Sequence, residues 1–216
     1  MLSRVLRGLV KKQTIFRSLF ELSLESLTPS SGAVVDLGGV KMPFPGYAKA
    51  LKADAERITT VNISTTVGAD IVGDAAATGL ASALADDIWM FNLLEHVEYP
   101  ERVLAEAKRL AKPGARCIGV VPFLLGIHGE PDDYLRYTKS KLMGLLRDAG
   151  FTDVKITAIG HGPFVAGASQ VQALLPWFVS GLPVVFAWCT DMTLFKLRPQ
   201  WREKWPLGYV FEARAM

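Results

Sequence analysis

The sequence predicts a single α/β domain in which helices cover both faces of a mostly parallel sheet. Three observations support this fold class. The 216 residues are enough for one domain with a well-buried core. Half of them are hydrophobic and 21% are charged, which is typical of a globular chain. Short apolar runs alternate with helical patterns along the chain, and this alternation is typical of parallel sheets with crossover helices.

Runs of apolar and β-branched residues predict the strands, and amphipathic patterns predict the main helices. The clearest helix covers residues 99–111, because Pro100 stands at its start and an apolar stripe includes Val103 and Ala107. A second helix covers residues 138–149 and ends at Gly150. The predicted strands cover residues 33–37, 58–63, 70–72, 88–92, 117–121, 154–159 and 209–213.

The N-terminal segment, residues 1–27, is predicted to be helical, basic and amphipathic. Its first 20 residues carry lysines and arginines but no acid, and apolar residues recur there at helical spacing. Three interpretations stand: a surface helix packed on the domain, a helix that contacts anionic lipid, or a transit peptide. No apolar run with a small-residue cleavage site follows, so secretion is not expected.

Residues 161–205 are predicted to form an apolar helical insertion before the last strand. From residue 156 to residue 190 the chain has no Asp, Glu, Lys or Arg. Residues 171–190 are long enough to span a bilayer, but Pro176 and Pro183 interrupt them. A span would also separate the last strand from its sheet. We therefore expect a buried lid, a dimer surface or a membrane-contacting hairpin of helices.

Charge and cysteine content exclude some partners and favour a compartment. The net charge of +3 is mild and the basic residues beyond the N-terminus are scattered, so no nucleic-acid partner is expected. Cys117 and Cys189 lie far apart without a metal-like spacing, which favours two reduced thiols in a cytoplasmic protein. Peripheral contact with the inner face of the membrane stays open, as does a homodimer.

Ligands of open α/β sheets bind beyond the carboxyl ends of the strands, so polar residues that follow strands are the candidate site residues. After the first strand, Asp36 can pair with a ligand ammonium, and Gly38 and Gly39 let the backbone approach a ligand. The same glycines also suit a simple turn. Asn62 ends the second strand, where nucleotide binders usually place an acid for ribose hydroxyls, and its amide oxygen can accept one such hydrogen bond.

Two further places carry ionisable or polar groups after strands. Asp74 and Ala75 follow the third strand, where they can read an adenine edge; alternatively, Asp74 is the N-cap of a helix over residues 75–84. Asn92, Glu95 and His96 follow the buried fourth strand, where ionisable groups are costly unless they are paired or functional. The alternative is that Glu95 and His96 fix the entry to the next helix.

The connection from residue 122 to residue 137 is unusually long for a compact domain, and such loops are usually functional. Its mixture of imidazole, acids, aromatic rings and a guanidinium suits the rim of an active site. No metal site is predicted, because the spacing of the histidine from the acids matches no established ligand pattern. The residues concerned are His128, Asp132, Asp133, Tyr134, Arg136 and Tyr137.

Taken in order, these segments resemble class I S-adenosylmethionine-dependent methyltransferases, in particular small bacterial members with a Leu-Glu-His segment after strand four. The resemblance covers residues 32–160, and residues 206–209 fit the closing strand. It implies a Rossmann-like, three-layer fold with a seven-stranded, mostly parallel sheet whose last strand is antiparallel. The matching segments are residues 34–39, 70–75, 92–97, 110–114, 122–123, 128–138 and 148–151.

The resemblance also implies a cofactor, S-adenosylmethionine, and roles for the candidate residues. It places the methionine part over Asp36 and Gly38, the ribose near Asn62, the adenine near Asp74 and Ala75, and the reactive methyl near Asn92 to Glu95. The implied reaction is direct displacement at the sulfonium methyl, for which the protein supplies alignment and, where needed, a base. His128 is the first candidate base and His96 the second. Asp133, Tyr134, Arg136 and Tyr137 are expected to shape the acceptor pocket.

The first motif departs from the family pattern, because Val40 and Met42 stand where further glycines are usual. The expected function is methyl transfer to an unidentified acceptor, such as a glycan, a lipid-linked substrate or another small molecule. The alternative is a degenerate methyltransferase domain that acts as a non-catalytic binding module. A nucleotide-dependent oxidoreductase is disfavoured, since the chain lacks a Gly-x-Gly-x-x-Gly run with an acid about 20 residues on.

Overall fold

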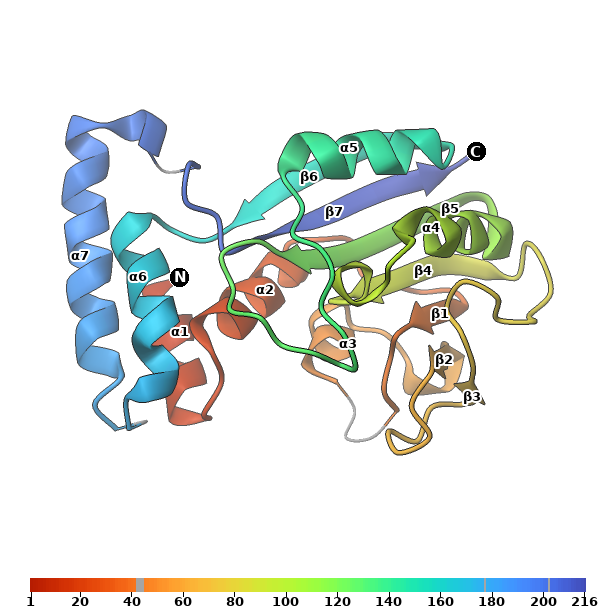
Figure 1. The fold of residues 1–216 in the computed structure, drawn as a ribbon, viewed down its shortest axis with the longest axis horizontal. Coiled ribbons are helices and arrows are strands. Elements are labelled where there is room, and N and C mark those ends of the chain that lie inside the picture. The colour runs from red at the N-terminus through yellow and green to blue at the C-terminus, as the bar shows by residue number, and fades with distance from the viewer. Residues whose placement is uncertain (42–44, 177, 202) are drawn as a thin grey trace.

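The computed structural model describes residues 1–41, 45–176, 178–201 and 203–216, so Met42 lies outside the described residues. Its centre is a seven-stranded sheet in the order β3-β2-β1-β4-β5-β7-β6, and β7 runs antiparallel to both of its neighbours. The three-layer, Rossmann-like fold with an antiparallel last strand is thereby confirmed (Figure 1). The strands are β1 Val34–Leu37, β2 Ile58–Asn62, β3 Ile71–Val72, β4 Ala85–Phe91, β5 Ala111–Pro122, β6 Phe151–Ile159 and β7 Gly208–Ala215.

Strand order reverses beside β1, which pairs with β2 on one side and β4 on the other. All four residues of β1 are buried, as a central parallel strand requires. Leu37 is in register with Val61 of β2 and Met90 of β4, so the three strands end at the same edge. The segments that follow these strands are therefore neighbours, and this edge is where an open α/β sheet binds its ligands.

Helices cover both faces of the sheet. On one face, the apolar stripe of α4 (Pro100–Leu110) packs with α5 (Lys139–Asp148), as the periodicity predicts. On the other face, α2 (Ile15–Glu25) and α3 (Gly46–Ala50) pack against the side chains of Trp89 and Ile118. Short 3-10 turns occupy η1 Ala55–Arg57, η2 Leu94–His96, η3 Gln172–Leu174 and η4 Pro199–Trp201.

The N-terminal segment forms a helical hairpin, in which α1 (Leu2–Val10) precedes α2. The chain reverses at Lys12, which has a left-handed φ of 60°, and Thr14 caps α2 by accepting a hydrogen bond from the Arg17 amide. The apolar residues of α1 are partly covered by α2 and by a late helix, α7 (Gly181–Leu197). The segment is thus packed on the domain.

The apolar stretch before β7 forms two helices, α6 (Pro163–Val171) and α7. They lie beyond the carboxyl end of β6 and, together with α1, form a helical lobe beside the sheet (Figure 1). Among the described residues, no helix is both long and apolar enough to cross a membrane.

The helix over residues 75–84, one of the two alternatives for Asp74, is absent. The chain between β3 and β4 forms turns instead. Asp74 Oδ1 accepts a hydrogen bond from the Ala76 amide, 2.8 Å away, which closes a local turn. Gly79 (φ 73°) and Ala83 (φ 53°) then adopt left-handed conformations, which a helix does not allow.

Candidate active site at the carboxyl edge of the sheet

A tight turn follows β1, and Asn62 holds it in place. Gly38 has a φ of 79°, a conformation that favours glycine, and its amide donates to the Val61 carbonyl. Asn62 Nδ2 donates to the carbonyl oxygens of Gly38, at 3.0 Å, and Gly39, at 3.1 Å. Asn62 Oδ1 accepts from the Ser64 amide. The amide thus fixes the turn from β2. The sequence predicts a contact with a ribose for Asn62, but not this role.

Asp36 is buried at the end of β1 with one oxygen unpaired. Its side chain is 1% exposed, and Oδ2 accepts a hydrogen bond of 2.8 Å from the Tyr47 hydroxyl. Oδ1 has no hydrogen-bond partner in the described part of the chain. Burial raises the pKa of Asp36 to about 7, while the Tyr47 hydrogen bond acts in the opposite direction. Gly39 is needed here because a Cβ at that position would collide with the Asp36 carboxyl.

Tyr47 and Leu93 are the two neighbours of this turn that sequence reasoning missed. Tyr47 comes from the short helix α3 and packs its ring 4.6 Å from that of Phe91. Leu93 follows β4 and lies over Gly38, where a Cβ would be 3.0 Å from Leu93 Cδ1. No local pattern distinguishes either residue from ordinary core, so only the fold assigns them to the site.

The remaining cofactor-site candidates lie along the same edge. Asp74 is exposed after β3, and the adjacent Ala75 is buried. Asn92 follows β4 with a left-handed φ of 52°, and its amide donates to the Val120 carbonyl of β5. Asn92 Oδ1 is buried and has no hydrogen-bond partner among the residues described. Asp36 and Asn92 therefore each present an unpaired oxygen at the edge where β1 and β4 end.

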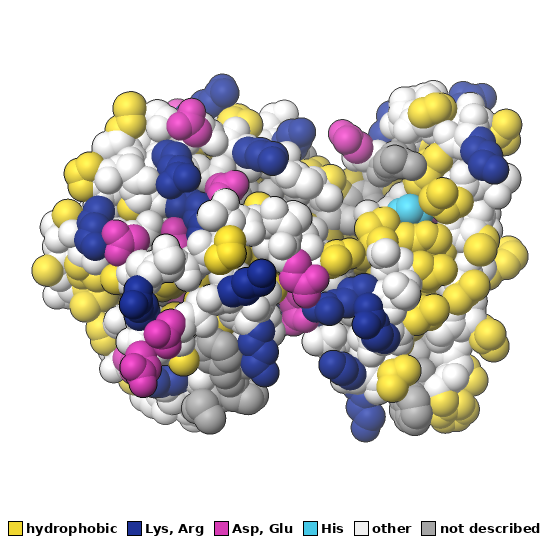
Figure 2. All heavy atoms as spheres, turned by 180° about the vertical axis from the view of Figure 1, so that it is seen from behind, with side chains coloured by type: hydrophobic (Ala, Val, Ile, Leu, Met, Phe, Trp, Pro, Cys, Tyr) yellow, Lys and Arg dark blue, Asp and Glu magenta, His cyan; other side chains and the backbone are white. Residues whose placement is uncertain are grey.

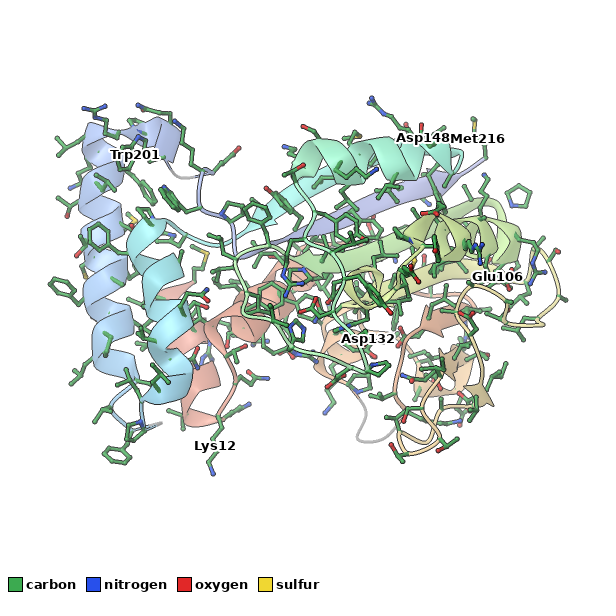
Figure 3. The ribbon with its side chains drawn as sticks, in the orientation of Figure 1. Lys12, Glu106, Asp132, Asp148, Trp201 and Met216 are labelled. Atoms are coloured by element: carbon green, nitrogen blue, oxygen red, sulfur yellow. The ribbon has the colours of Figure 1, made fainter. Side chains whose placement is uncertain are left out.

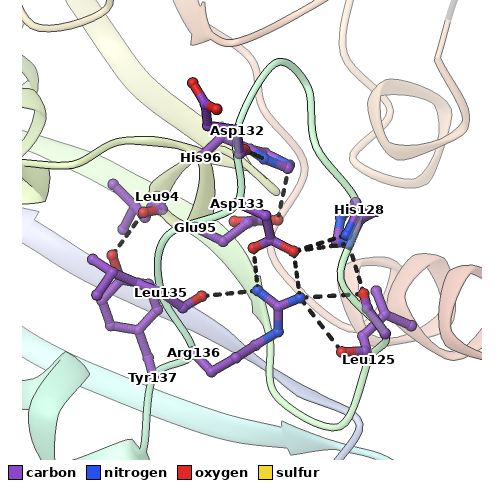
Figure 4. A network of polar contacts seen from close by, with 11 residues as sticks. Leu94, Glu95, His96, Leu125, His128, Asp132, Asp133, Leu135, Arg136 and Tyr137 are labelled. Atoms are coloured by element: carbon purple, nitrogen blue, oxygen red, sulfur yellow. Dashed lines mark hydrogen bonds and ion pairs between the residues drawn. The ribbon is translucent and has the colours of Figure 1, made fainter.

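A cluster of one carboxyl group and two imidazoles begins shortly after Asn92 in the chain. Glu95 is 0% exposed, and its Oε1 lies 3.7 Å from His96 Nε2. His128 reaches the same place from the loop after β5, with its ring 5.1 Å from that of His96 (Figure 4). Neither oxygen of Glu95 has a hydrogen-bond partner among the described residues. Burial raises the pKa of Glu95 to about 8.

An ion pair within the long loop holds His128 in position. Arg136 binds both oxygens of Asp133, and one of these oxygens also accepts a 2.8 Å hydrogen bond from the His128 amide. Arg136 donates as well to the Gly126 carbonyl, 3.2 Å away. The Arg136 hydrogen bonds hold the pKa of Asp133 well below its usual range. Both charged groups, predicted as lining of an acceptor pocket, are thus occupied in shaping the loop (Figure 4).

The two tyrosines of the loop have different surroundings. Tyr137 is 1% exposed and its hydroxyl donates a 2.7 Å hydrogen bond to the Leu94 carbonyl, so in this structure it anchors the loop and does not line an open pocket. Tyr134 is 48% exposed, and its hydroxyl donates to Asp132. Asp132 lies toward the carboxyl ends of β4 and β5, whereas Glu106 and Met216 lie at the opposite end of the sheet (Figure 3).

A surface hollow of about 570 Å³ lies away from this edge, between the N-terminal helices and α3. Figure 2 shows basic and acidic side chains together at the waist between the two lobes. In the hollow, Arg4 pairs with Glu25, and Glu21 pairs with Arg17 beside it. Because none of the candidate residues lines this hollow, we place the candidate site at the sheet edge.

Comparison with known proteins identifies a related domain. Residues 45–119 match the family model described as a methyltransferase domain. The match begins after the glycine turn and ends inside β5, so it contains Asn62, Glu95 and His96 but not Asp36 or His128. No curated protein matches the chain by sequence.

Solved structures share the whole fold at low sequence identity. A SAM-dependent methyltransferase from Archaeoglobus fulgidus matches with a TM-score of 0.60 and 15% identity, over 92% of this chain and 94% of its own. A second match is a 1,6-didemethyltoxoflavin-N1-methyltransferase from Burkholderia thailandensis, solved with bound 1,6-didemethyltoxoflavin and S-adenosylhomocysteine. Its TM-score is 0.52 and its sequence identity 17%, over 93% of this chain and 76% of its own. The cyclase SpnF matches with a TM-score of 0.57 and 15% identity, over 93% of this chain and 81% of its own. The fold is thus that of these proteins, and it does not by itself fix the reaction.

Proposed function

We propose that this chain is an S-adenosylmethionine-dependent methyltransferase. The observation that carries the proposal is the row of unpaired buried oxygens on Asp36, Asn92 and Glu95 at the carboxyl edge of β1 and β4, on a fold shared with such enzymes. A buried polar atom without a partner costs free energy, so a ligand that satisfies it gains affinity. These acceptor oxygens fit the cofactor, which carries an ammonium and a sulfonium charge.

Each residue then has a defined task. Asp36 Oδ1 accepts a hydrogen bond from the cofactor ammonium, and Gly38 and Gly39 keep the backbone free of side chains there. Asn62 fixes the turn and offers its amide oxygen to the ribose, and Asp74 with Ala75 contacts the adenine. The bound cofactor supplies an electrophilic methyl group. Asn92 Oδ1 would border that group.

The binding experiment compares two cofactors. S-adenosylhomocysteine titrated into the full chain should give binding heat, and NAD should give none. The absence of heat with S-adenosylhomocysteine at millimolar concentration would instead support the non-catalytic binding module. Asp36→Ala should weaken binding by about 1.5–3 kcal/mol, since a hydrogen bond to a charged group is lost. Asp148→Asn, an exposed acid at the far end of α5, is the control and should bind as the wild type does.

The acceptor loses its proton at the imidazole cluster. His128 Nδ1 lies 3.0 Å from the Gly126 carbonyl, so this nitrogen carries the ring proton and Nε2 carries the lone pair. His128 is therefore the first candidate base for an acceptor hydroxyl, and His96 is the second. Glu95 lies next to His96. Loss of a general base slows turnover by roughly 100- to 10,000-fold. His128→Ala should do so, and full turnover in His128→Asn would leave this residue a structural role only.

An acceptor with a lipid or other apolar portion fits the surroundings. The helical lobe lies beyond the carboxyl end of the sheet, and many of its exposed side chains are apolar, as the yellow surface in Figure 2 shows. Phe164 of α6 is 46% exposed and Leu182 of α7 is 76% exposed. Exposed apolar patches of this kind mark contacts with membranes, with ligands or with a second copy of the chain. Assays with glycan, lipid-linked and small hydroxyl acceptors would identify the class.

A further inference from the structure

The cluster at the carboxyl edge has the composition of a metal site. Glu95, His96 and His128 each offer a ligand atom, and these three atoms lie within 4.8 Å of one another. A carboxylate with two imidazoles is the donor set of many zinc sites and also suits other divalent transition metals. The sequence did not predict a metal here, because the third ligand, His128, comes from the loop that follows β5 and is remote in sequence from Glu95 and His96.

Both imidazoles are oriented as metal-binding histidines are. His96 Nδ1 lies 2.6 Å from the Asp132 carbonyl oxygen, and His128 Nδ1 lies 3.0 Å from the Gly126 carbonyl oxygen. A carbonyl accepts only, so each Nδ1 carries the proton and each Nε2 carries a lone pair. Metal-ligating histidines in general donate their second ring nitrogen to a carbonyl or carboxylate, which fixes the ring and its tautomer.

Glu95 supplies the second, independent observation. Its side chain is 0% exposed, and neither Oε1 nor Oε2 has a hydrogen-bond partner in the parts of the chain that the structure describes. Oε1 faces His96 Nε2 across 3.7 Å. Burying a carboxyl group without donors is costly, and a cation placed between the carboxylate and the two rings would offset this cost.

We propose that Glu95, His96 and His128 bind a divalent transition-metal cation of the zinc class. In a tetrahedral zinc site the ligand atoms lie roughly 3.3 Å apart, since each bond is about 2.0–2.2 Å. The pair Glu95 and His96 is already near that separation. The ligand atom of His128 reaches the same separation from the other two by a side-chain movement of about 1–2 Å. The 38% exposed ring allows this movement. Three protein ligands leave a fourth position open.

The open position defines the acceptor class, and this part of the proposal depends on the proposed function. We place it toward the methyl group of the bound cofactor, because Asn92 and Glu95 both follow β4. A zinc-class cation there can take an oxygen or a thiolate sulfur as its fourth ligand, so the acceptor is a hydroxyl, carboxylate or thiol compound. The lone pair of His128 cannot serve as both metal ligand and base, and a metal titration decides between these two uses.

The test is a titration of Co²⁺ alone into the chelator-treated full chain, followed by displacement with Zn²⁺. We expect one equivalent of Co²⁺ to give the visible d–d absorption of a four-coordinate site, and Zn²⁺ to abolish it. Glu95→Gln, His96→Gln and His128→Asn should each weaken Co²⁺ binding at least tenfold. Asp148→Asn, which alters an exposed acid at the far end of α5, and Cys189→Ser, which removes the exposed thiol, should bind Co²⁺ as the wild type does.

Absence of one-equivalent binding, or binding that the three ligand variants leave unchanged, would overturn the proposal. Should Glu95→Gln fail to fold, His128→Asn carries the test, because its ring is partly exposed and its removal leaves the core intact. S-adenosylhomocysteine is titrated separately in the presence of a chelator. Cofactor binding without Co²⁺ binding refutes the metal site alone, and Co²⁺ binding without cofactor binding refutes the methyltransferase alone.

Discussion

Two buried acids, Glu95 in the sheet lobe and Asp191 in the helical lobe, are both 0% exposed but differ in their partners. Asp191 of α7 accepts hydrogen bonds from two amides at the start of α6, those of Phe164 at 3.1 Å and Val165 at 2.8 Å. It thereby satisfies the N-terminus of one helix from the side of another. Glu95 has no hydrogen-bond donor on either oxygen among the described residues.

The difference distinguishes structure from function. In the helical lobe a buried charge is used within the fold, and the exposed surface is apolar, as at Leu182 and Phe186. At the sheet edge the buried oxygens of Asp36, Asn92 and Glu95 are left for a ligand. Burial alone therefore does not identify a functional acid; burial without a partner does.

The largest effect on stability is expected where the buried acid is structural. Asp191→Ala leaves two helix-terminal amides without an acceptor and should lower the free energy of unfolding by about 2–4 kcal/mol. Urea denaturation measures this loss. Binding of S-adenosylhomocysteine at the sheet edge should change less than twofold. A loss below about 1 kcal/mol would mean that Asp191 does not stabilise the helical lobe through these two hydrogen bonds.

Replacement of the buried carboxyl group of Glu95, in contrast, should raise the free energy of unfolding at neutral and higher pH. Burial raises its pKa from the usual 4.5 to about 8, so the native state holds a proton that the unfolded chain releases above pH 4.5. The wild type should therefore lose stability as pH rises from about 5 to 8, and Asp36, with its pKa raised to about 7, adds to the loss.

Glu95→Gln removes its part of this pH dependence. In chelator, the variant should gain stability relative to the wild type between pH 5 and pH 9, by a few kcal/mol at most, since one pKa unit corresponds to about 1.4 kcal/mol. Urea denaturation at the two pH values provides the comparison, and Asp148→Asn serves as the matched acid-to-amide control. Parallel pH profiles for Glu95→Gln and the wild type would contradict the role assigned to burial.

The smallest effect on stability is expected on the exposed face of α7. Leu182 is 76% exposed and Phe186 is 71% exposed, so Leu182→Ser and Phe186→Ser should change the free energy of unfolding by about 0.5 kcal/mol or less. The same pair of substitutions should reduce sedimentation of the chain with anionic lipid vesicles several-fold. Unchanged sedimentation would remove the lipid contact, and a shift from dimer to monomer would assign the face to a second copy.

The sequence by itself determined the order of elements, because their signals are local. The predicted helix over residues 99–111 is α4 (Pro100–Leu110), and the predicted strand over residues 33–37 is β1 (Val34–Leu37). Apolar periodicity, a proline at a helix start and a glycine after a strand act within a few residues. The boundaries of β5 moved most: residues 117–121 were predicted, and Ala111–Pro122 are observed because the strand continues through pairing with β4.

Where local signals are ambiguous, tertiary contacts decided the outcome. A capping pattern at Asp74 suits a helix or a turn equally, and the turn formed. The sequence also predicts that Asp36, Asn62, Glu95 and His128 lie at the carboxyl edge of the sheet, since the carboxyl ends of parallel strands meet there.

Only the tertiary structure decided which of these side chains have partners. Asn62 is bound to Gly38 and Gly39, and Tyr47 occupies one oxygen of Asp36. Glu95 and His128 meet although β5 lies between them in the chain. A hydrogen bond or a metal ligand set depends on distances of a few ångströms between residues remote in sequence. No local pattern encodes those distances, because the packing of the whole sheet and its loops sets them.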